Sequence, residues 1–134
     1  MTSSMVSRWP VVVEAVVAAG DRDDHGALTP VGLERLFHAG WCAYVERCPT
    51  LEAAGGAVEL LAERHGGACE AGDRVDVAVG ASELFATRLH VGMRVRGGSC
   101  DLGVDATWSV AVGAVTPALR DELIALAHGA TSTL

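Results

Sequence analysis

Three aspartates and a histidine lie together in one short segment bounded by glycines, Gly20-Asp21-Arg22-Asp23-Asp24-His25-Gly26. A carboxylate in such a segment can attack a carbonyl carbon or activate a water molecule that attacks it. His25 could be a base or could cap the turn, and Asp21 and Asp24 fit the pattern of solvent-exposed turn residues. Because the carboxylates are close in sequence, each is expected to raise the pKa of the others.

A long helix is predicted directly after this segment. Thr29 is a favourable N-cap and Pro30 suits the first helical position. Between the charged residues near the two ends, Ala39 to Val45 carry no charge over about two turns, and Cys48-Pro49 ends the helix. A helix that is apolar on all sides is normally buried on all sides. We therefore expect a central helix wrapped by protein, with the aspartates at its N-terminal end.

The rest of the chain predicts a sheet. Valine-rich or alternating segments predict strands, whereas Ala57–His65 fits either a strand or a helix. The predicted strands are Val11–Ala18, Arg74–Val79, Phe85–Arg96 and Val104–Ala114. About five mostly antiparallel strands curled around one helix make the fold α+β. A single sheet of this kind leaves edges and an outer face uncovered, so pairing with a second subunit is expected.

Three shorter segments complete the prediction. Thr116-Pro117 repeats the threonine cap and proline, which predicts a short C-terminal helix that runs to His128 and stops at Gly129. Residues 49–56 are expected to form a loop, and residues 1–8 a frayed end.

Composition excludes several classes of protein. The chain has 134 residues, which fits one domain over residues 1–134, and a net charge of −7. All basic residues are arginines and none form a run, so nucleic-acid binding is not expected. The sequence contains no stretch of about 20 apolar residues, so no membrane span is predicted. The expected location is the cytoplasm, where cysteines stay reduced; the chain has Cys42, Cys48, Cys69 and Cys100.

Two motifs resemble those of the hotdog-fold thioesterases, specifically the branch of 4-hydroxybenzoyl-CoA thioesterase. The segment Asp21 to Leu28 is similar to the family's Asp-x-Asp-x-x-Gly-(His/Ile)-Val, and Ala71-Gly72-Asp73-Arg74-Val75 to its (Ala/Pro)-Gly-Asp-x-Val; together they cover most of residues 10–115. The resemblance implies a hotdog fold and a homodimer or homotetramer with active sites between subunits. It also implies hydrolysis of acyl-CoA or acyl-carrier-protein thioesters without a cofactor.

By this resemblance Asp23 would be the catalytic carboxylate. Amides at the helix N-terminus would stabilise the oxyanion with help from the helix dipole. His25, Gly26, Thr29, Val31 and Glu34 would support it, with Glu34 as the reserve carboxylate. The acyl group would lie along the uncharged middle of the helix, near Phe37 and Trp41, unless these two belong only to the core.

Two departures from the family pattern leave an alternative open. The family often uses an amide at the position of Pro30, and proline has no N–H, so Val31 or an amide in the turn would have to donate instead. Members that bind CoA often place basic residues where this chain has Leu84-Phe85-Ala86. The alternative is a non-catalytic hotdog protein that binds a hydrophobic acyl or aromatic ligand.

The remaining polar clusters have simpler interpretations. Arg94 and Arg96 share a strand face with Arg88 and His90, where they could bind a phosphate or carboxylate or could be the solvated outer face of the sheet. The spacing His-x-x-x-Cys occurs twice, in His38/Cys42 and His65/Cys69, and could serve zinc on a helix. Nothing in the sequence brings the two pairs together, so no metal is expected.

Overall fold

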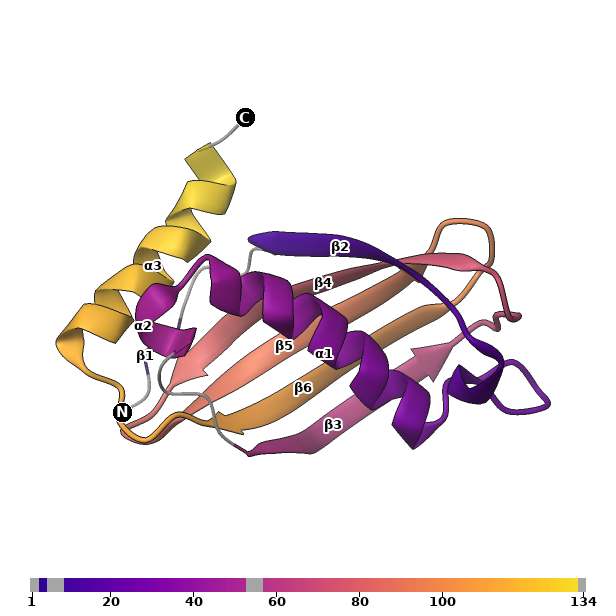
Figure 1. Ribbon diagram of the computed structural model, residues 1–134, viewed down its shortest axis with the longest axis horizontal. Coiled ribbons are helices and arrows are strands. Elements are labelled where there is room, and N and C mark those ends of the chain that lie inside the picture. Colours follow the sequence, from indigo (N-terminus) through magenta and orange to yellow (C-terminus); the bar gives the residue numbers. More distant parts are fainter. Residues whose placement is uncertain (1–2, 5–8, 53–56, 133–134) are drawn as a thin grey trace.

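The computed structural model describes residues 3–4, 9–52 and 57–132 (Figure 1). Its helices are α1 (Pro30–Glu46), α2 (Pro49–Glu52) and α3 (Pro117–Ser132), and a short 3-10 turn, η1 (Ala19–Asp21), precedes α1. Its strands are β1 (Ser3–Ser4), β2 (Val11–Val16), β3 (Val58–Gly66), β4 (Arg74–Leu84), β5 (Arg88–Gly97) and β6 (Gly103–Ala111). No helix in these residues is long and apolar enough to cross a membrane.

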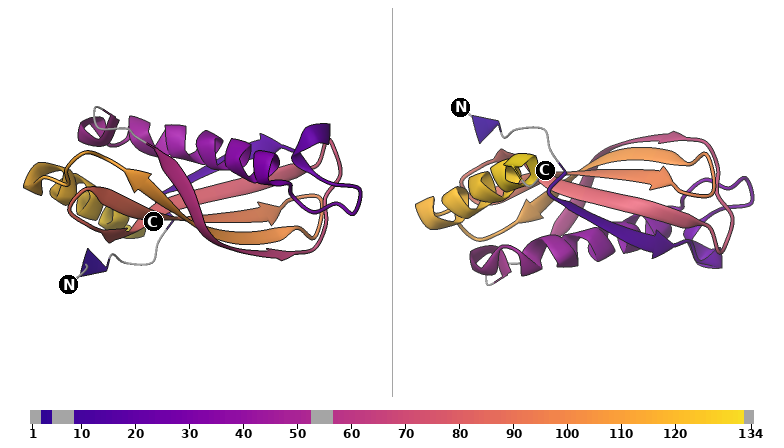
Figure 2. Two further views of the ribbon diagram at one scale, coloured as in Figure 1. Left: turned by 90° about the horizontal axis from the view of Figure 1, so that it is seen from below. Right: turned by 90° about the horizontal axis from the view of Figure 1, so that it is seen from above.

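The strands form one antiparallel sheet. Its order is β2-β4-β5-β6-β3, and the two-residue β1 pairs with the far end of β4 on the same side as β2. Helix α1 lies along one face of the curved sheet, and both views of Figure 2 show it on one side of the strands. This arrangement confirms the predicted α+β hotdog fold with a long helix and a C-terminal helix.

Alternating strand residues and one side of α1 build the core. Leu89, Val91, Met93 and Val95 of β5 are buried, whereas Arg88, Arg94 and Arg96 on the opposite face of the strand are exposed. From α1, Leu33, Leu36, Phe37 and Tyr44 reach the sheet and are fully buried. The alternation predicted for β5 is therefore the one that packs the sheet against α1.

The prediction that α1 is buried on all sides is wrong. The side of α1 that faces away from the sheet is exposed in the single chain, and Val31 near the start of the helix is 72% exposed. Ala39 and Cys42 in the uncharged middle are also exposed. These side chains are small, so a helix can present them to water without charges and without a large apolar area. The absence of charge therefore did not require burial.

Several element boundaries also differ from the predicted ones. Phe85 lies in the turn between β4 and β5, where its N–H donates to the Arg88 carbonyl over 2.9 Å, because β4 runs on to Leu84 past a bulge near Ala81. Strand β6 ends at Ala111, and Gly113 beyond it has a φ of 72°. The ambiguous segment is strand β3.

The shorter segments were predicted less well. Helix α3 continues past Gly129 to Ser132, since a glycine costs a helix only about 1 kcal/mol relative to alanine. Residues Pro49–Glu52 form α2 instead of a loop, and residues 53–56 of that predicted loop lie outside the described residues. Of the predicted frayed end, Ser3–Ser4 pair with β4, and residues 1–2 and 5–8 lie outside the described residues.

Candidate functional site

The acidic segment folds into a closed turn in front of α1, and Asp23 holds it together. Oδ1 of Asp23 accepts the His25 N–H at 2.8 Å and the Ala27 N–H at 3.1 Å, and its main chain bonds to Ala27 and Gly26. These two N–H groups hold the pKa of the Asp23 carboxyl below its ordinary value. Its Oδ2 accepts no hydrogen bond from the described residues, and the side chain is exposed. The carboxylate is thus fixed, ionised and open on one side.

The sequence led us to expect Asp21 to face solvent, but it is buried, with 3% of its surface exposed. Its carboxylate binds Arg35, whose Nε lies 2.8 Å from Oδ1 and 3.0 Å from Oδ2, and Nη2 of Arg35 also contacts Oδ2. The hydrogen bond from Arg35 lowers the pKa of Asp21 against the opposing effect of burial. The expectation that the aspartates raise one another's pKa is therefore wrong for Asp21 and Asp23, because hydrogen bonds to the ionised forms lower both pKa values.

The start of α1 has one free amide. Oγ1 of Thr29 accepts the Gly32 N–H at 3.0 Å, which confirms Thr29 as the N-cap, and the Leu33 N–H begins the helical pattern by donating to the Thr29 carbonyl. Pro30 has no N–H. The Val31 N–H has no hydrogen-bond partner in the described part of the chain. An amide at a helix N-terminus that points to no protein acceptor is suited to bind an anionic oxygen.

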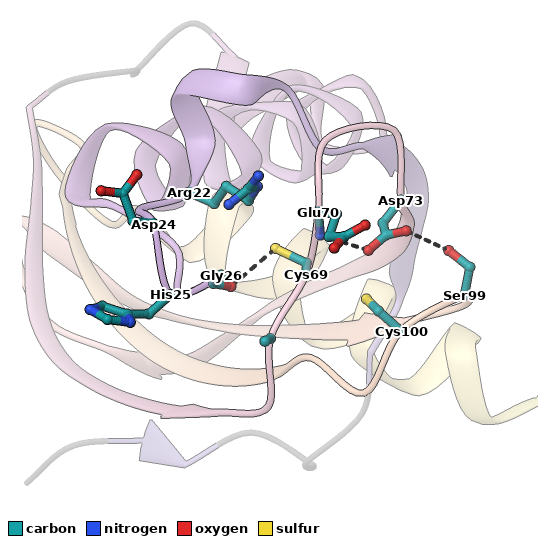
Figure 3. A pocket seen from close by; sticks show the side chains of 10 residues that line it. Arg22, Asp24, His25, Gly26, Cys69, Glu70, Asp73, Ser99 and Cys100 are labelled. Carbon is teal, nitrogen blue, oxygen red and sulfur yellow. Dashed lines mark hydrogen bonds between the residues drawn. The ribbon is translucent and has the colours of Figure 1, made fainter.

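A pocket of about 390 Å³ lies beside the turn (Figure 3). Asp24 and His25 line it from the turn, Cys69 and Glu70 from the β3–β4 connection, and Cys100 from the β5–β6 connection; Asp23 does not line it. The N–H and the thiol of Cys69 both reach the Gly26 carbonyl, at 2.9 and 3.4 Å. Burial raises the pKa of the Cys69 thiol, which therefore stays neutral near pH 7.

The aromatic candidates lie in the core between α1 and the sheet. Phe37 stacks on Trp108 with ring centroids 4.5 Å apart, and on Trp41 with ring centroids 5.9 Å apart. Tyr44 follows Trp41 at 5.5 Å. Trp108 Nε1 and Tyr44 Oη are buried without a hydrogen-bond partner in the described part of the chain. The sequence marks Tyr44 and Trp108, like Phe37 and Trp41, as residues of the core or of an acyl pocket, but a missing hydrogen-bond partner can be seen only in three dimensions.

The other predicted residues lie apart from this turn or point to solvent. Glu34 is exposed and its Oε1 lies 3.6 Å from Nε2 of His38. Arg94 and Arg96 extend from the outer face of the sheet and pair with Asp105 at 3.1 and 3.3 Å, and the Arg94 guanidinium lies 5.2 Å from the Trp9 ring centre. The structure thus brings Asp23, His25, Gly26, Thr29 and Val31 to one end of α1 and leaves the arginines on the opposite sheet face.

The His-x-x-x-Cys pairs form no common cluster. His38 lies beside Glu34 on α1, and His65 contacts Glu63 at 2.9 Å on β3. Within the ranges that the structure describes, no three histidine, cysteine, aspartate or glutamate side chains are arranged to hold a metal ion. All four cysteines are free thiols.

Comparison with known proteins supports the fold through structure alone. No family model and no curated protein sequence matches the chain. A thioesterase from Thermus thermophilus, complexed with coenzyme A and Zn, is similar, with a TM-score of 0.70, 16% identity, and coverage of 92% of this chain and 98% of that chain.

Two further solved structures give the same result. The 1,4-dihydroxy-2-naphthoyl-CoA thioesterase Slr0204 from Synechocystis has a TM-score of 0.58 at 15% identity, over 84% of this chain and 94% of its own. The Staphylococcus aureus protein SAV2348 in complex with CoA has a TM-score of 0.60 at 9% identity, over 94% and 87%. The chain therefore has the hotdog fold of the thioesterases that it resembles.

Proposed function

We propose that the protein hydrolyses acyl thioesters with Asp23 as its catalytic carboxylate. The observation that carries this proposal is an ionised carboxylate in the turn that leads into α1, with one oxygen hydrogen-bonded and the other free of any bond from the described residues. Oδ1 of Asp23 is held by the His25 and Ala27 N–H groups, and Oδ2 remains open. At the start of α1 the Val31 N–H has no partner in the described part of the chain. A general base or nucleophile and an oxyanion donor are the two groups that thioester hydrolysis needs.

The proposed reaction follows from these two groups. The Val31 N–H and the positive end of the α1 dipole polarise the thioester carbonyl. Asp23 takes a proton from a water molecule whose oxygen adds to the carbonyl carbon, or its own oxygen adds first to give an anhydride that water then opens. The C–S bond breaks as the tetrahedral intermediate collapses, and the thiolate leaves and takes up a proton.

We propose acyl-CoA as the substrate, with acyl-carrier-protein thioesters as the alternative. Two similar structures were solved in complex with CoA, which supports the first choice. The acyl group would lie against the uncharged middle of α1, where Ala39 and Cys42 are exposed and small. A phosphate bound by Arg94 and Arg96 would compete with Asp105, which now accepts hydrogen bonds from both arginines.

We also propose that the working form is a homodimer or a tetramer built from it. Strand β3 is bonded to β6 on one side, and no described strand covers its other edge. Leu61 on this strand is 44% exposed. A free strand of this length pairs readily with a second copy. Light scattering should give twice or four times the chain mass, and Leu61→Lys should shift the protein toward the monomer; a native protein that is monomeric at assay concentration would overturn this assembly.

The alternative function is binding without hydrolysis. Pro30 removes the amide that the resembled family uses, and Asp23 does not line the described pocket. Such a protein would hold a hydrophobic acyl or aromatic ligand by the same fold. The two functions differ in turnover, which a direct assay decides.

The test is a thioesterase screen with detection of the free thiol. Short, long and aromatic acyl-CoA and acyl-carrier-protein thioesters should reveal at least one substrate. Asp23→Asn should then lower kcat by about a hundredfold or more. Asp121→Asn is the control, because Asp121 is an exposed aspartate on α3 that does not line the pocket, and this variant should keep its activity. Absence of turnover across the panel together with tight ligand binding would favour the alternative, and an unchanged rate in Asp23→Asn would refute the role of Asp23.

A further inference from the structure

Asp21 and Arg35 form a half-buried ion pair that connects three parts of the chain; the Asp21 side chain is 4% exposed and the Arg35 side chain 45%. Arg35 lies on α1 and donates through Nη2 to the Val16 carbonyl at 2.9 Å, at the end of β2. The same guanidinium binds the Asp21 carboxylate of η1 through Nε and Nη2. Oδ2 of Asp21 also accepts the Ala18 N–H at 2.8 Å. A planar guanidinium that uses two nitrogen atoms on one carboxylate fixes orientation as well as distance.

The main chain of Asp21 makes a second, separate connection to the start of α1. Its carbonyl accepts the Thr29 N–H at 2.8 Å and the Thr29 hydroxyl at 3.2 Å. Residues 22–28 therefore form a loop whose two ends are joined at Asp21 and Thr29, and an antiparallel bridge between Arg22 and Leu28 narrows its base. The loop carries Asp23, and Val31 follows directly after the cap.

We propose that Asp21 and Arg35 are positioning residues that fix the Asp23 carboxylate relative to the free Val31 amide. This inference rests on the proposed hydrolysis for its kinetic consequence, but not for its structural one. Neither side chain reaches the reacting atoms: Asp21 is buried, and the Arg35 guanidinium is engaged with Asp21 and Val16. They act by holding the loop that carries one group against the helix that carries the other.

The position of these two groups matters more in the transition state than in the substrate complex. A displacement of about 1 Å in a catalytic group costs about a hundredfold in rate. Binding of the acyl group and of the thiol carrier involves other surfaces, so it should change little. Loss of the ion pair is therefore expected to lower kcat and to leave KM nearly unchanged.

The test uses Asp21→Asn, Arg35→Gln and the double variant in the full-length protein. Each single change should lower kcat by about tenfold to a hundredfold. The kcat of the double variant should be no lower than that of the slower single variant, as expected when two residues are partners in one interaction. Arg35→Lys keeps the charge without the fork and should recover part of the rate. The control is Arg74→Gln, which removes an exposed pair with Glu14 and should change nothing.

Hydrogen exchange at single amides, followed by NMR, gives a second readout that is independent of activity. The His25 and Ala27 N–H groups are held by Asp23 Oδ1, so their protection should fall in Asp21→Asn, in Arg35→Gln and to a lesser degree in Arg35→Lys. Amides in β5 should keep their protection in any of these variants that remains folded. If Asp23→Asn proves active, hydrolysis by Asp23 fails, while this measurement still decides whether the pair holds the loop. Unchanged protection of His25 and Ala27, or an unchanged kcat with lost protection, would overturn the positioning role.

Discussion

Gly32 of α1 packs directly against the main chain of Asp21. A Cβ atom at position 32 would lie 2.5 Å from the Asp21 Cα and closer still to its carbonyl oxygen. Such distances do not occur between real side chains and backbone, so the first turn of α1 can approach η1 only because residue 32 is glycine. This contact places the Asp21 carbonyl where Thr29 donates to it.

Replacement of Gly32 by alanine should therefore destabilise the protein, although alanine is the better helix former. The clash is with backbone, which cannot rotate away, and overpacking of this kind costs about 1–3 kcal/mol. The helix gains back about 1 kcal/mol at most. Urea unfolding should show a net loss in Gly32→Ala and almost none in Gly20→Ala, where a Cβ would meet no atom within 4 Å. Equal stability of both variants would show that the contact is looser than described.

The pH dependence of hydrolysis should reflect the hydrogen bonds to Asp23. The His25 and Ala27 N–H groups hold the pKa of Asp23 below its ordinary value of about 3.9. The carboxylate is active only when ionised, so activity falls as the pH drops through that lowered pKa. The acid limb of kcat/KM should therefore lie below about pH 4. A limb near neutral pH that persists in His25→Gln would show that another group or another environment controls the reaction.

The sequence predicted the elements of this fold better than it predicted the contacts of the site. The cap and proline of Thr29-Pro30 and the alternation of β5 act locally, so they were visible in the sequence. The ion pair between Asp21 and Arg35 joins residues far apart in the sequence, and nothing in the spacing distinguishes Asp21 from its solvated neighbours Asp23 and Asp24. The uncharged middle of α1 was misinterpreted for a related reason, because sequence does not tell which small residues the sheet covers.

The buried hydroxyl of Tyr44 gives a test of the core. Tyr44 is fully buried, and no group in the described part of the chain makes a hydrogen bond of good geometry with its Oη. Burial raises the pKa of Tyr44 above the ordinary value, against a smaller opposing effect of the nearby Ala81 main chain. An unsatisfied buried polar group costs about 1–3 kcal/mol. Tyr44→Phe should therefore leave the free energy of unfolding unchanged or raise it, whereas Tyr44→Ala should lower it by about 3–5 kcal/mol through loss of the ring. A clear loss of stability in Tyr44→Phe would reveal a hydrogen bond or an ordered water at this hydroxyl.

The ion pair between Asp21 and Arg35 should also make the stability of the protein depend on pH in acid. Arg35 holds the folded-state pKa of Asp21 below the value of about 3.9 that an unfolded aspartate has. A carboxyl with a lowered folded-state pKa stabilises the folded state fully above the unfolded value, and this contribution disappears as the pH falls through the folded value. The free energy of unfolding, measured with urea from neutral pH down to about pH 3, should fall more steeply in the native protein than in Asp21→Asn. Asp24→Asn should show the native slope, since Asp24 is exposed in the same turn. Parallel curves for the native protein and Asp21→Asn would mean that Asp21 is not held ionised by Arg35 in solution.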